Sequence, residues 1–367
     1  MENVSQMYRY PIALTQQFRY CGNPFRVDMY KGCDFGCSYC FANSRKGGYN
    51  SNPDISDINI IKKLFIKAFE SDKEYKDLTT ELLRHRVPLH LGGLSDPFQN
   101  REWVNRLTYE FLKISNKYNY PVIISTKCAN LPKEYLDILN PDIHAFQISL
   151  MGYNEEFVRK YEKNTPSPNE RINFIKLLSD SKFWVSLRIQ PLIDIDEALL
   201  LVKEIKDYIK YITIEHLKIP VDNNEIKDIF RHLLNVNYYK PKQGRAFELL
   251  HDMKIENIQK IKQITNLPIG VGDNDLHELS SSRCCCGIDC INSNFSNWFK
   301  YNYTYLITGK PEKDLWYPKG NVRSCINNTD RISKDMNTVK DYVDYYCDKF
   351  QYSILKGKLK YWGWEKE

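Results

Sequence analysis

Long apolar stretches are missing from this sequence, and none approaches the roughly 18–20 residues that a membrane span needs. The first ten residues are polar and lack the apolar core of a secretion signal. The sequence also lacks a P-loop, a G-x-G-x-x-G dinucleotide motif and an H-E-x-x-H zinc motif. We therefore expect neither a membrane protein nor a secreted one, and we expect a cytoplasmic location.

The sequence also has little net charge. Its 52 Lys and Arg residues nearly balance its 46 Asp and Glu residues, which leaves a formal net charge of +6 in 367 residues. Residues 300–367 carry 13 basic and 9 acidic side chains, so most of the excess lies there. A basic segment can follow a polyanion such as DNA or RNA. The same mild excess also fits an ordinary solvated surface, and both interpretations stay open.

Cysteine is abundant instead, with 11 residues that fall into groups. One group is Cys33, Cys37 and Cys40, and a second lies between Cys284 and Cys290. Disulfide scaffolds belong to small secreted domains, whereas clustered thiols in a large chain without an export signal indicate metal.

Short apolar runs alternate with helical patterns over the first two thirds of the chain, which predicts an α/β fold with a parallel sheet and right-handed crossovers. Six such units would form an open or closed α/β barrel. The predicted strands are Phe25–Tyr30, Val87–Leu91, Pro121–Ser125, Ala145–Leu150, Trp184–Gln190 and Tyr211–Leu217. The predicted helices are Ile58–Phe69, Val104–Asn116, Lys133–Leu139, Asn169–Leu178 and Asp196–Tyr208.

Beyond Leu217 the alternation weakens. Residues 225–265 have a helical pattern, and Leu267–Val271 reads as one more strand. From Gly272 the composition shifts to Cys, Asn, Trp and Tyr. We therefore predict a core domain over residues 1–272 and a Cys- and aromatic-rich C-terminal cap over residues 273–367.

The strongest signal is Cys33-Asp-Phe-Gly-Cys37-Ser-Tyr-Cys40, a C-x3-C-x2-C spacing directly after the first long strand. Three thiolates can each hold one iron of a [4Fe-4S] cluster and leave the fourth iron open for a small molecule. Zinc is the alternative, but zinc sites usually pair two C-x2-C knuckles and close with four protein ligands. The spacing favours a cluster.

This loop resembles the radical S-adenosylmethionine (SAM) superfamily, whose signature is the same triplet with an aromatic residue, here Tyr39, before the last Cys. The resemblance implies a partial (β/α)6 TIM-like barrel and SAM chelated by the open iron. It also implies that the cluster cleaves SAM to a 5′-deoxyadenosyl radical, which abstracts hydrogen from a substrate. An electron donor such as flavodoxin or ferredoxin would be the partner.

Several segments are similar to the spore photoproduct lyase-like branch of that superfamily, over about residues 20–217. They are Tyr30–Phe41, Leu91–Asp96, Ser125–Lys127, Phe146–Ser149, Glu162–Arg171 and Val185–Pro191. The branch suggests a nucleic-acid base as substrate.

Within these segments we expect a SAM site at the ends of successive strands. Gly92 and Gly93 let the backbone approach the methionine amino group closely, and Asp96 beside Ser95 accepts from that ammonium. Lys127 would pair with the SAM carboxylate. The remaining expected contacts are Ser149 to ribose, Tyr39 to adenine and Arg188 to a carboxylate or a substrate anion.

Two positions depart from the photoproduct lyases. Those enzymes carry a hydrogen-donating Cys where this sequence has Gly93, and a second Tyr where it has Phe41. We therefore predict that the protein is not itself a photoproduct lyase. Cys128 could donate hydrogen instead, although a small buried hydrophobic role fits it as well.

The second cysteine group, Arg283-Cys-Cys-Cys-Gly-Ile-Asp-Cys290, predicts a second metal site, either a cluster or zinc. Its expected ligands are Cys284 or Cys285, with Cys286 and Cys290, and Cys325 or Cys347 as a distant fourth. Buried thiols or a redox-active pair are the alternatives.

Two functions follow from the sequence. The first is a radical SAM enzyme that acts on a substrate such as a nucleic-acid base. The second is a nucleic-acid-binding module stabilised by an iron–sulfur cluster or zinc, which would have no reason to cleave SAM.

Overall fold

The computed structural model describes residues 11–15, 23–44, 54–74, 77–234, 237–240, 246–273, 275–276, 279–281, 284–295, 318–325, 337–339 and 341. Most of the predicted cap, with Cys347, therefore lies outside the described residues. The boundary after residue 272 stays a prediction.

One sheet of eight strands organises the described chain, in the order β1-β2-β3-β4-β5-β6-β7-β11. The strands are β1 Ile12–Leu14, β2 Phe25–Val27, β3 Leu89–Leu91, β4 Val122–Thr126, β5 His144–Ser149, β6 Trp184–Leu192, β7 Tyr211–His216 and β11 Ile269–Val271. Strand β1 pairs with β2 in antiparallel fashion, and every other neighbouring pair is parallel. Among the described residues β1 and β11 do not pair, so the barrel is partial, and the predicted fold class is confirmed.

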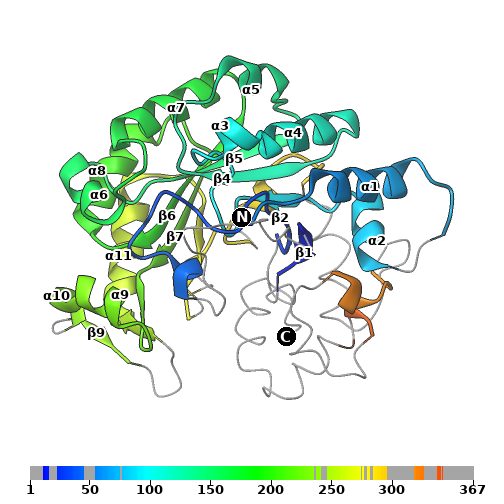
Figure 1. Cartoon of the computed structure of the whole chain (residues 1–367). Coiled ribbons are helices and arrows are strands. Elements are labelled where there is room, and N and C mark those ends of the chain that lie inside the picture. Colours follow the sequence, from blue (N-terminus) through cyan, green and yellow to red (C-terminus); the bar gives the residue numbers. More distant parts are fainter. Residues whose placement is uncertain are drawn as a thin grey trace, which may run out of the picture.

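Helices connect these strands and cover the outer side of the sheet (Figure 1). They are α1 Ile58–Phe69, α2 Leu78–Arg84, α3 Glu102–Asn105, α4 Leu107–Lys117, α5 Lys133–Ile138, α6 Glu155–Tyr161, α7 Pro168–Asp180, α8 Ile195–Ile205 and α11 His251–Ile264. Helix α1 has the predicted bounds, and the Asp57 carboxylate caps it by accepting from the Asn59 amide. Helix α7 begins with a Ser167 cap and Pro168, completed by Glu170 as a capping box.

The two faces of the sheet differ in chemistry. The parallel register places Arg26, His90, Ser125, Gln147 and Arg188 on one face. Most of the alternate residues, which face the helices, are apolar, among them Val27, Leu91, Ile124, Ile148, Leu187, Ile214 and Val271. Successive strand residues point to opposite sides, so this alternation separates an apolar layer under the helices from a polar barrel interior.

The predicted helix Val104–Asn116 is wrong at its start, because two helices meet at Arg106 in a left-handed conformation with φ 53°. Glu102 causes the break. Its buried carboxylate accepts from the Thr108 and Tyr109 amides, each at 2.9 Å, and so caps α4 from the preceding helix. The hydroxyl groups of Tyr30 and Tyr135 also donate to Glu102, at 2.5 and 2.7 Å.

The helical prediction for residues 225–265 is correct only at its two ends. Helices α9 Asn224–Ile229 and α10 Arg231–Leu234 are followed by strands β9 Tyr238–Tyr239 and β10 Ala246–Leu249, before α11. Strand β10 pairs with β8 Lys218–Pro220 and with β9 in a small antiparallel sheet. Figure 1 shows this sheet, with α9 and α10, beside the main body.

Two later segments pack on the barrel. Residues 284–291 include a 3-10 helix at Ile288–Cys290, and Cys284, Cys286 and Ile288 belong to the main hydrophobic core. Residues 318–325, with a 3-10 helix at Val322–Cys325, lie against α2, where the Gly320 amide donates to Glu81 at 2.7 Å. No described helix is long and apolar enough to cross a membrane.

Candidate functional site

The loop that carries Cys33, Cys37 and Cys40 follows β2 at the C-terminal mouth of the partial barrel. The backbone turns at Gly32 and Gly36 with φ of 100° and 61°, a region that favours glycine. Gln99 holds the start of the loop, donating to the Gly32 carbonyl at 3.0 Å and accepting from the Asp34 amide at 3.2 Å. The Ser38 amide donates to the Tyr161 carbonyl at 2.9 Å, which ties the loop to α6.

The three thiols form a donor set that suits iron. None of them is in a disulfide, and Cys37 interacts electrostatically with both Cys33 and Cys40. Burial raises the pKa of Cys37 to about 12 and raises that of Cys33 as well. A buried thiol becomes a thiolate readily only beside a cation, so the loop fits the positive iron of a cluster.

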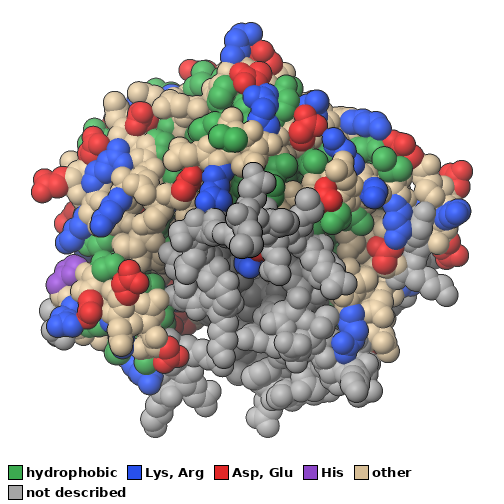
Figure 2. All heavy atoms as spheres, in the orientation of Figure 1, with side chains coloured by type: hydrophobic (Ala, Val, Ile, Leu, Met, Phe, Trp, Pro, Cys, Tyr) green, Lys and Arg blue, Asp and Glu red, His purple; other side chains and the backbone are tan. Residues whose placement is uncertain are grey.

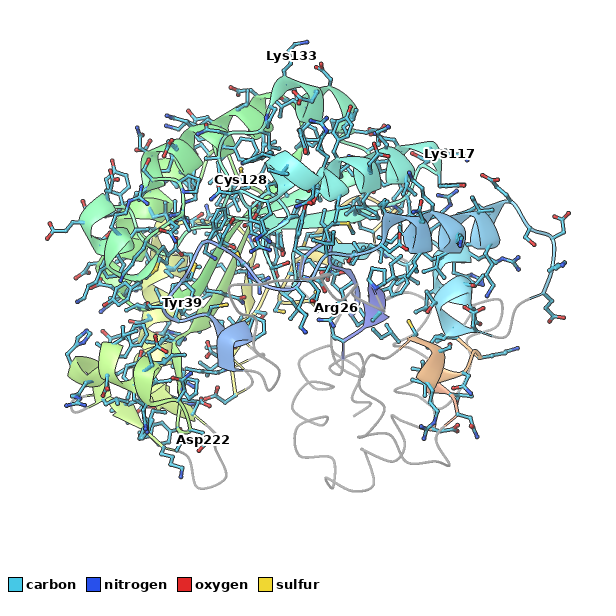
Figure 3. The ribbon with its side chains drawn as sticks, viewed as in Figure 1. Arg26, Tyr39, Lys117, Cys128, Lys133 and Asp222 are labelled. Atoms are coloured by element: carbon cyan, nitrogen blue, oxygen red, sulfur yellow. The ribbon has the colours of Figure 1, made fainter. Side chains whose placement is uncertain are left out.

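Tyr39, which is labelled in Figure 3, donates its hydroxyl proton to the carboxylate of Glu162, and its expected contact with adenine stays a prediction. Glu162 in turn pairs with Arg171 at 2.7 Å, and both side chains are at most 1% exposed. Arg171 also donates to the Ser149 carbonyl at 2.9 Å. Burial opposes ionisation of Glu162, but Arg171 and Lys127 outweigh it and hold the pKa of Glu162 below its usual value. The loop therefore rests on a buried charged network.

Lys127 belongs to the same neighbourhood. Its ammonium nitrogen lies 5.7 Å from the centre of the Tyr39 ring. Burial disfavours its charged form, yet Cys37 and Glu162 dominate and raise the pKa of Lys127. A positive charge therefore stands beside the cysteine loop, where an anionic carboxylate would be attracted.

The Asp96 carboxylate accepts hydrogen bonds from neighbouring groups of the chain. One carboxylate oxygen accepts from Thr126 at 2.8 Å and from the Phe98 amide at 3.0 Å, while the other accepts from the Lys127 amide at 2.7 Å. The Ser95 hydroxyl donates to the Tyr30 carbonyl at 2.6 Å. Both buried residues thus fasten the loop after β3 to β2 and β4. Their predicted contacts with SAM stay a prediction.

Gly92 and Gly93 differ in their surroundings. Gly92 has φ 88°, and a Cβ built on it would lie 2.2 Å from the Ser125 carbonyl oxygen. A Cβ on Gly93 would lie 3.6 Å from His90 Nδ1, an ordinary contact. The backbone at Gly92 approaches β4 so closely that a side chain is excluded, whereas Gly93 leaves room for one.

Polar side chains join across the interior face of the sheet. Ser125 lies 2.7 Å from His90 Nε2 and donates to Gln147 Oε1 at 2.8 Å. Arg188 donates to the same oxygen at 3.4 Å. Burial, with Arg188 and Arg26 nearby, lowers the pKa of His90 to about 3, so this imidazole is neutral near pH 7. The interior presents a neutral imidazole between two guanidinium groups.

Cys128 lies in the core at 4% exposure, and burial raises the pKa of its thiol to about 12. In Figure 3 it lies among packed side chains, whereas Lys117 and Lys133 project from the outer rim. Its surroundings suit a small buried hydrophobe. The hydrogen-donor role stays a prediction.

The second cysteine group only partly assembles as expected. The sulfur atoms of Cys284, Cys285 and Cys286 all lie within 4.8 Å of one another. Cys290 is exposed and Cys325 is buried beside Thr79 and Leu14, and neither belongs to this group of three. The backbone of these three cysteines lies against the interior face of the sheet, since their carbonyls accept from side chains of β5 and β7.

Sequence reasoning missed most of this supporting structure. Glu162 and Arg171 received no role, nor did Gln99, His90 or Gln147. Each joins segments far apart in the chain, such as Tyr39 and Glu162 at a separation of 123 residues. The alternation of polar and apolar residues in the strands is the one signal that marks the interior-facing set.

Comparison with known families gives one match. Residues 27–193 match the family described as Radical SAM superfamily. The matched range contains the three-cysteine loop and the strands through β6, and it confirms the superfamily predicted from the loop. No curated protein matches the chain.

Several solved structures are similar at low identity. Spore photoproduct lyase complexed with dinucleoside spore photoproduct is 12% identical, with a TM-score of 0.49 over 72% of this chain and 77% of that one. SuiB from Streptococcus suis bound to S-adenosylmethionine is 11% identical, with a TM-score of 0.46 over 69% and 52%. The methyltransferase TsrM from Kitasatospora setae is 7% identical, with a TM-score of 0.45 over 66% and 51%.

Proposed function

Because residues 27–193 are a radical SAM domain and the protein is therefore a radical SAM enzyme, we propose that Cys33, Cys37 and Cys40 hold its [4Fe-4S] cluster. The observation that carries this assignment is the position of the loop at the C-terminal mouth of a parallel barrel, the place where such folds put their active sites. When bound, the cluster and SAM supply a 5′-deoxyadenosyl radical that abstracts a hydrogen atom from the substrate.

The residues around the loop would hold SAM in place. Lys127 offers a charge-assisted hydrogen bond to the SAM carboxylate from a site beside Tyr39 and Cys37. Gly92 and Gly93 bring main chain to the same edge of the sheet without a side chain between them. Ser149, at the end of β5, would bond the ribose. Asp96 and Ser95 shape the loop that presents these groups.

The polar interior would hold the substrate. Arg188 and Gln147 carry donor and acceptor groups of the kind that pair with the edges of nucleic-acid bases. Arg26 adds a second positive charge on the same face. We infer that the substrate is a polar ring such as a nucleic-acid base, and that flavodoxin or ferredoxin supplies the electron.

The charge distribution on the outer surface does not indicate a binding track for a long nucleic acid. On the face drawn in Figure 2, Lys and Arg are interspersed with Asp and Glu over the described residues. A long nucleic acid is usually followed by a continuous basic stripe. The inference therefore concerns the base itself, contacted within the barrel.

The first experiment tests the cluster and the chemistry together. Anaerobically reconstituted wild type is compared with a variant carrying Cys33→Ala, Cys37→Ala and Cys40→Ala, by iron and sulfide content and by 5′-deoxyadenosine formed from SAM and dithionite. We expect about four irons per loop and deoxyadenosine in the wild type only. Zinc in place of iron, without deoxyadenosine, would support the binding-module alternative instead.

The second experiment tests the substrate. Deoxyadenosine formation is followed with short DNA and RNA oligonucleotides and with unrelated peptides, and oligonucleotide affinity is measured at 50 and 200 mM salt. We expect stimulation by an oligonucleotide and weaker binding at the higher salt. Arg188→Met should reduce the stimulation without lowering the iron content. Stimulation by peptides alone would reject the nucleic-acid substrate.

A further inference from the structure

Three hydrogen bonds hold the segment Cys284–Cys286, one at each of its successive backbone carbonyl groups. The Cys284 carbonyl accepts from the Tyr211 hydroxyl at 2.8 Å, that of Cys285 from Thr213 at 2.9 Å and that of Cys286 from Gln147 at 3.1 Å. These donors come from two strands and are each fully buried. Binding all three carbonyls fixes the backbone, and therefore also the directions in which the three side chains leave it.

Two glycines make room for this arrangement. A Cβ on Gly270 of β11 would lie 2.3 Å from the Cys285 carbonyl oxygen, so no side chain fits there. Gly287 has φ 68°, and a Cβ on it would lie 2.7 Å from the Tyr211 ring. The chain passes so close to the sheet that both positions exclude larger residues. The cysteine segment is therefore a built part of the barrel interior.

The spacing of the sulfur atoms fits one shared ion. All three lie within 4.8 Å of one another, and Cys285 Sγ lies 3.9 Å from Cys286 Sγ. A disulfide would need about 2.05 Å. With a metal–sulfur distance of about 2.3 Å, two ligands of a tetrahedral zinc ion lie about 3.8 Å apart. Thiolates bound to separate irons of a cluster stand farther apart than two ligands of one ion.

We propose that Cys284, Cys285 and Cys286 bind a single Zn²⁺ ion in the interior of the barrel, apart from the Cys33–Cys40 loop. Sulfur-only donor sets select soft or borderline ions such as Zn²⁺. Three thiolates give the site a net charge of −1, and Arg26 and Arg188 stand near enough to act on the same His90 ring as Cys285. These positive groups, of which Arg26 is itself paired with Asp28 at 3.5 Å, favour an anionic site.

The fourth coordination position is open to water or to a substrate atom. Cys284 and Cys286 are buried, whereas Cys285 is half-buried, so the accessible side of the site is that of Cys285. Three protein ligands and one exchangeable position are typical of catalytic zinc sites. Zinc binding displaces the thiol protons into solvent, so the affinity of the site for Zn²⁺ should fall at lower pH. This inference does not depend on the proposed function.

The test uses the full chain with Cys33→Ala, Cys37→Ala and Cys40→Ala as background, so that the cluster loop contributes no metal. Zinc and iron are measured by mass spectrometry after dialysis against a weak chelator. We expect about one zinc per chain, falling at least fivefold when Cys284→Ser and Cys286→Ser are added. Cys290→Ser, an exposed cysteine next to the segment, and Cys325→Ala, a buried cysteine elsewhere, are matched controls that should keep the zinc.

A second measurement covers the case in which the double variant fails to fold. Co²⁺ is added to the background variant itself, where thiolate coordination gives a charge-transfer band and intense d–d bands. Zinc should also slow alkylation of the peptide that contains Cys284–Cys286 at least tenfold, without protecting Cys290. The proposal is overturned by a folded background variant without zinc, by iron with sulfide at this site, or by zinc that Cys290→Ser removes.

Discussion

At the scale of single residues, the Glu162–Arg171 pair is the clearest stabilising contact of the candidate site. Arg171 is fully buried, and it is the largest fully buried side chain among the residues that the structure describes. It neutralises Glu162 and holds the end of β5 through the Ser149 carbonyl. Because Glu162 also accepts from Tyr39, this pair determines where the aromatic residue of the cysteine loop lies.

Arg171→Met should therefore lower the free energy of unfolding by about 3–5 kcal/mol, since it leaves a buried carboxylate without its counter-charge. Lys176→Met is the control on the same helix, because it breaks the half-exposed Lys176–Glu204 pair and should cost at most about 1 kcal/mol. Chemical denaturation of both variants gives the comparison. Equal decreases in the free energy of unfolding would mean that the buried pair stabilises the protein no more than the half-exposed pair does.

The two neighbouring glycines give a second comparison. Gly92→Ala forces a Cβ toward the Ser125 carbonyl oxygen in a left-handed backbone, and should cost about 2–4 kcal/mol of stability. Gly93→Ala places its Cβ at ordinary contact distance from His90 and should cost little. Thermal unfolding of the two variants decides the point, and a larger loss for Gly93→Ala would contradict this geometry.

At the scale of elements, His144 links the start of β5 to α4. Its Nδ1 accepts from the Asn140 amide at 2.9 Å, so Nε2 carries the proton and donates to Ser115 Oγ at 2.8 Å. Burial lowers the pKa of His144 to about 3. A second ring proton would point at the Asn140 amide, which explains in structural terms why the neutral form is kept.

This link predicts how stability varies with pH. The unfolded chain binds a proton at His144 below about pH 6.5, whereas the folded chain does not until about pH 3. The free energy of unfolding should therefore fall as pH decreases through that window. His144→Gln should reduce the slope by up to one proton, about 1.4 kcal/mol per pH unit. Denaturation between pH 7 and 5 measures it, and an unchanged slope would refute the assignment.

The sequence predicted those elements that are determined by neighbouring residues. Helix α1 was predicted because an amphipathic repeat is visible in a few neighbouring positions of the sequence. The break at Arg106 was missed because its cause, the Glu102 carboxylate, acts only once Tyr30 and Tyr135 surround it. Strands β9 and β10 were missed because they are short and pair with β8.

The same division applies to the site. Cys33, Cys37 and Cys40 lie within eight residues, so their spacing alone indicated the cluster loop. Cys284–Cys286 were noticed for the same reason, but their expected partners Cys290 and Cys325 were chosen without knowledge of the fold. The structure groups the three adjacent thiols instead, because three carbonyl contacts across 72 to 139 residues fix their backbone.

At the scale of the whole molecule, the predicted boundary after residue 272 can be tested directly. Residues 284–291 pack on the interior face of the sheet, and their removal would replace the hydrogen bonds from Gln147, Tyr211 and Thr213 by bonds to water. Each such exchange costs about 0.5–1.5 kcal/mol. A chain ending at residue 272 should therefore be less stable than one ending at residue 295, by about 1.5–4.5 kcal/mol from these three bonds alone.

Limited proteolysis and denaturation of the two truncated chains, beside the full chain, measure this difference. Both truncations lose the contacts of residues 318–325 with α2, so those contacts cancel in the comparison. Equal stability of the two would show that residues 273–295 are an independent cap rather than part of the core.

The contact between Gln147 and Cys286 also has a consequence for synthesis on the ribosome. The two residues are 139 positions apart, so at about 5–20 residues per second the acceptor emerges roughly 7–28 s after the donor. During that interval the apolar outer face of strands β2 to β7 can already pack against its helices, while the polar inner face stays exposed to water. The nascent barrel should therefore form from the outside inward, with its centre completed last.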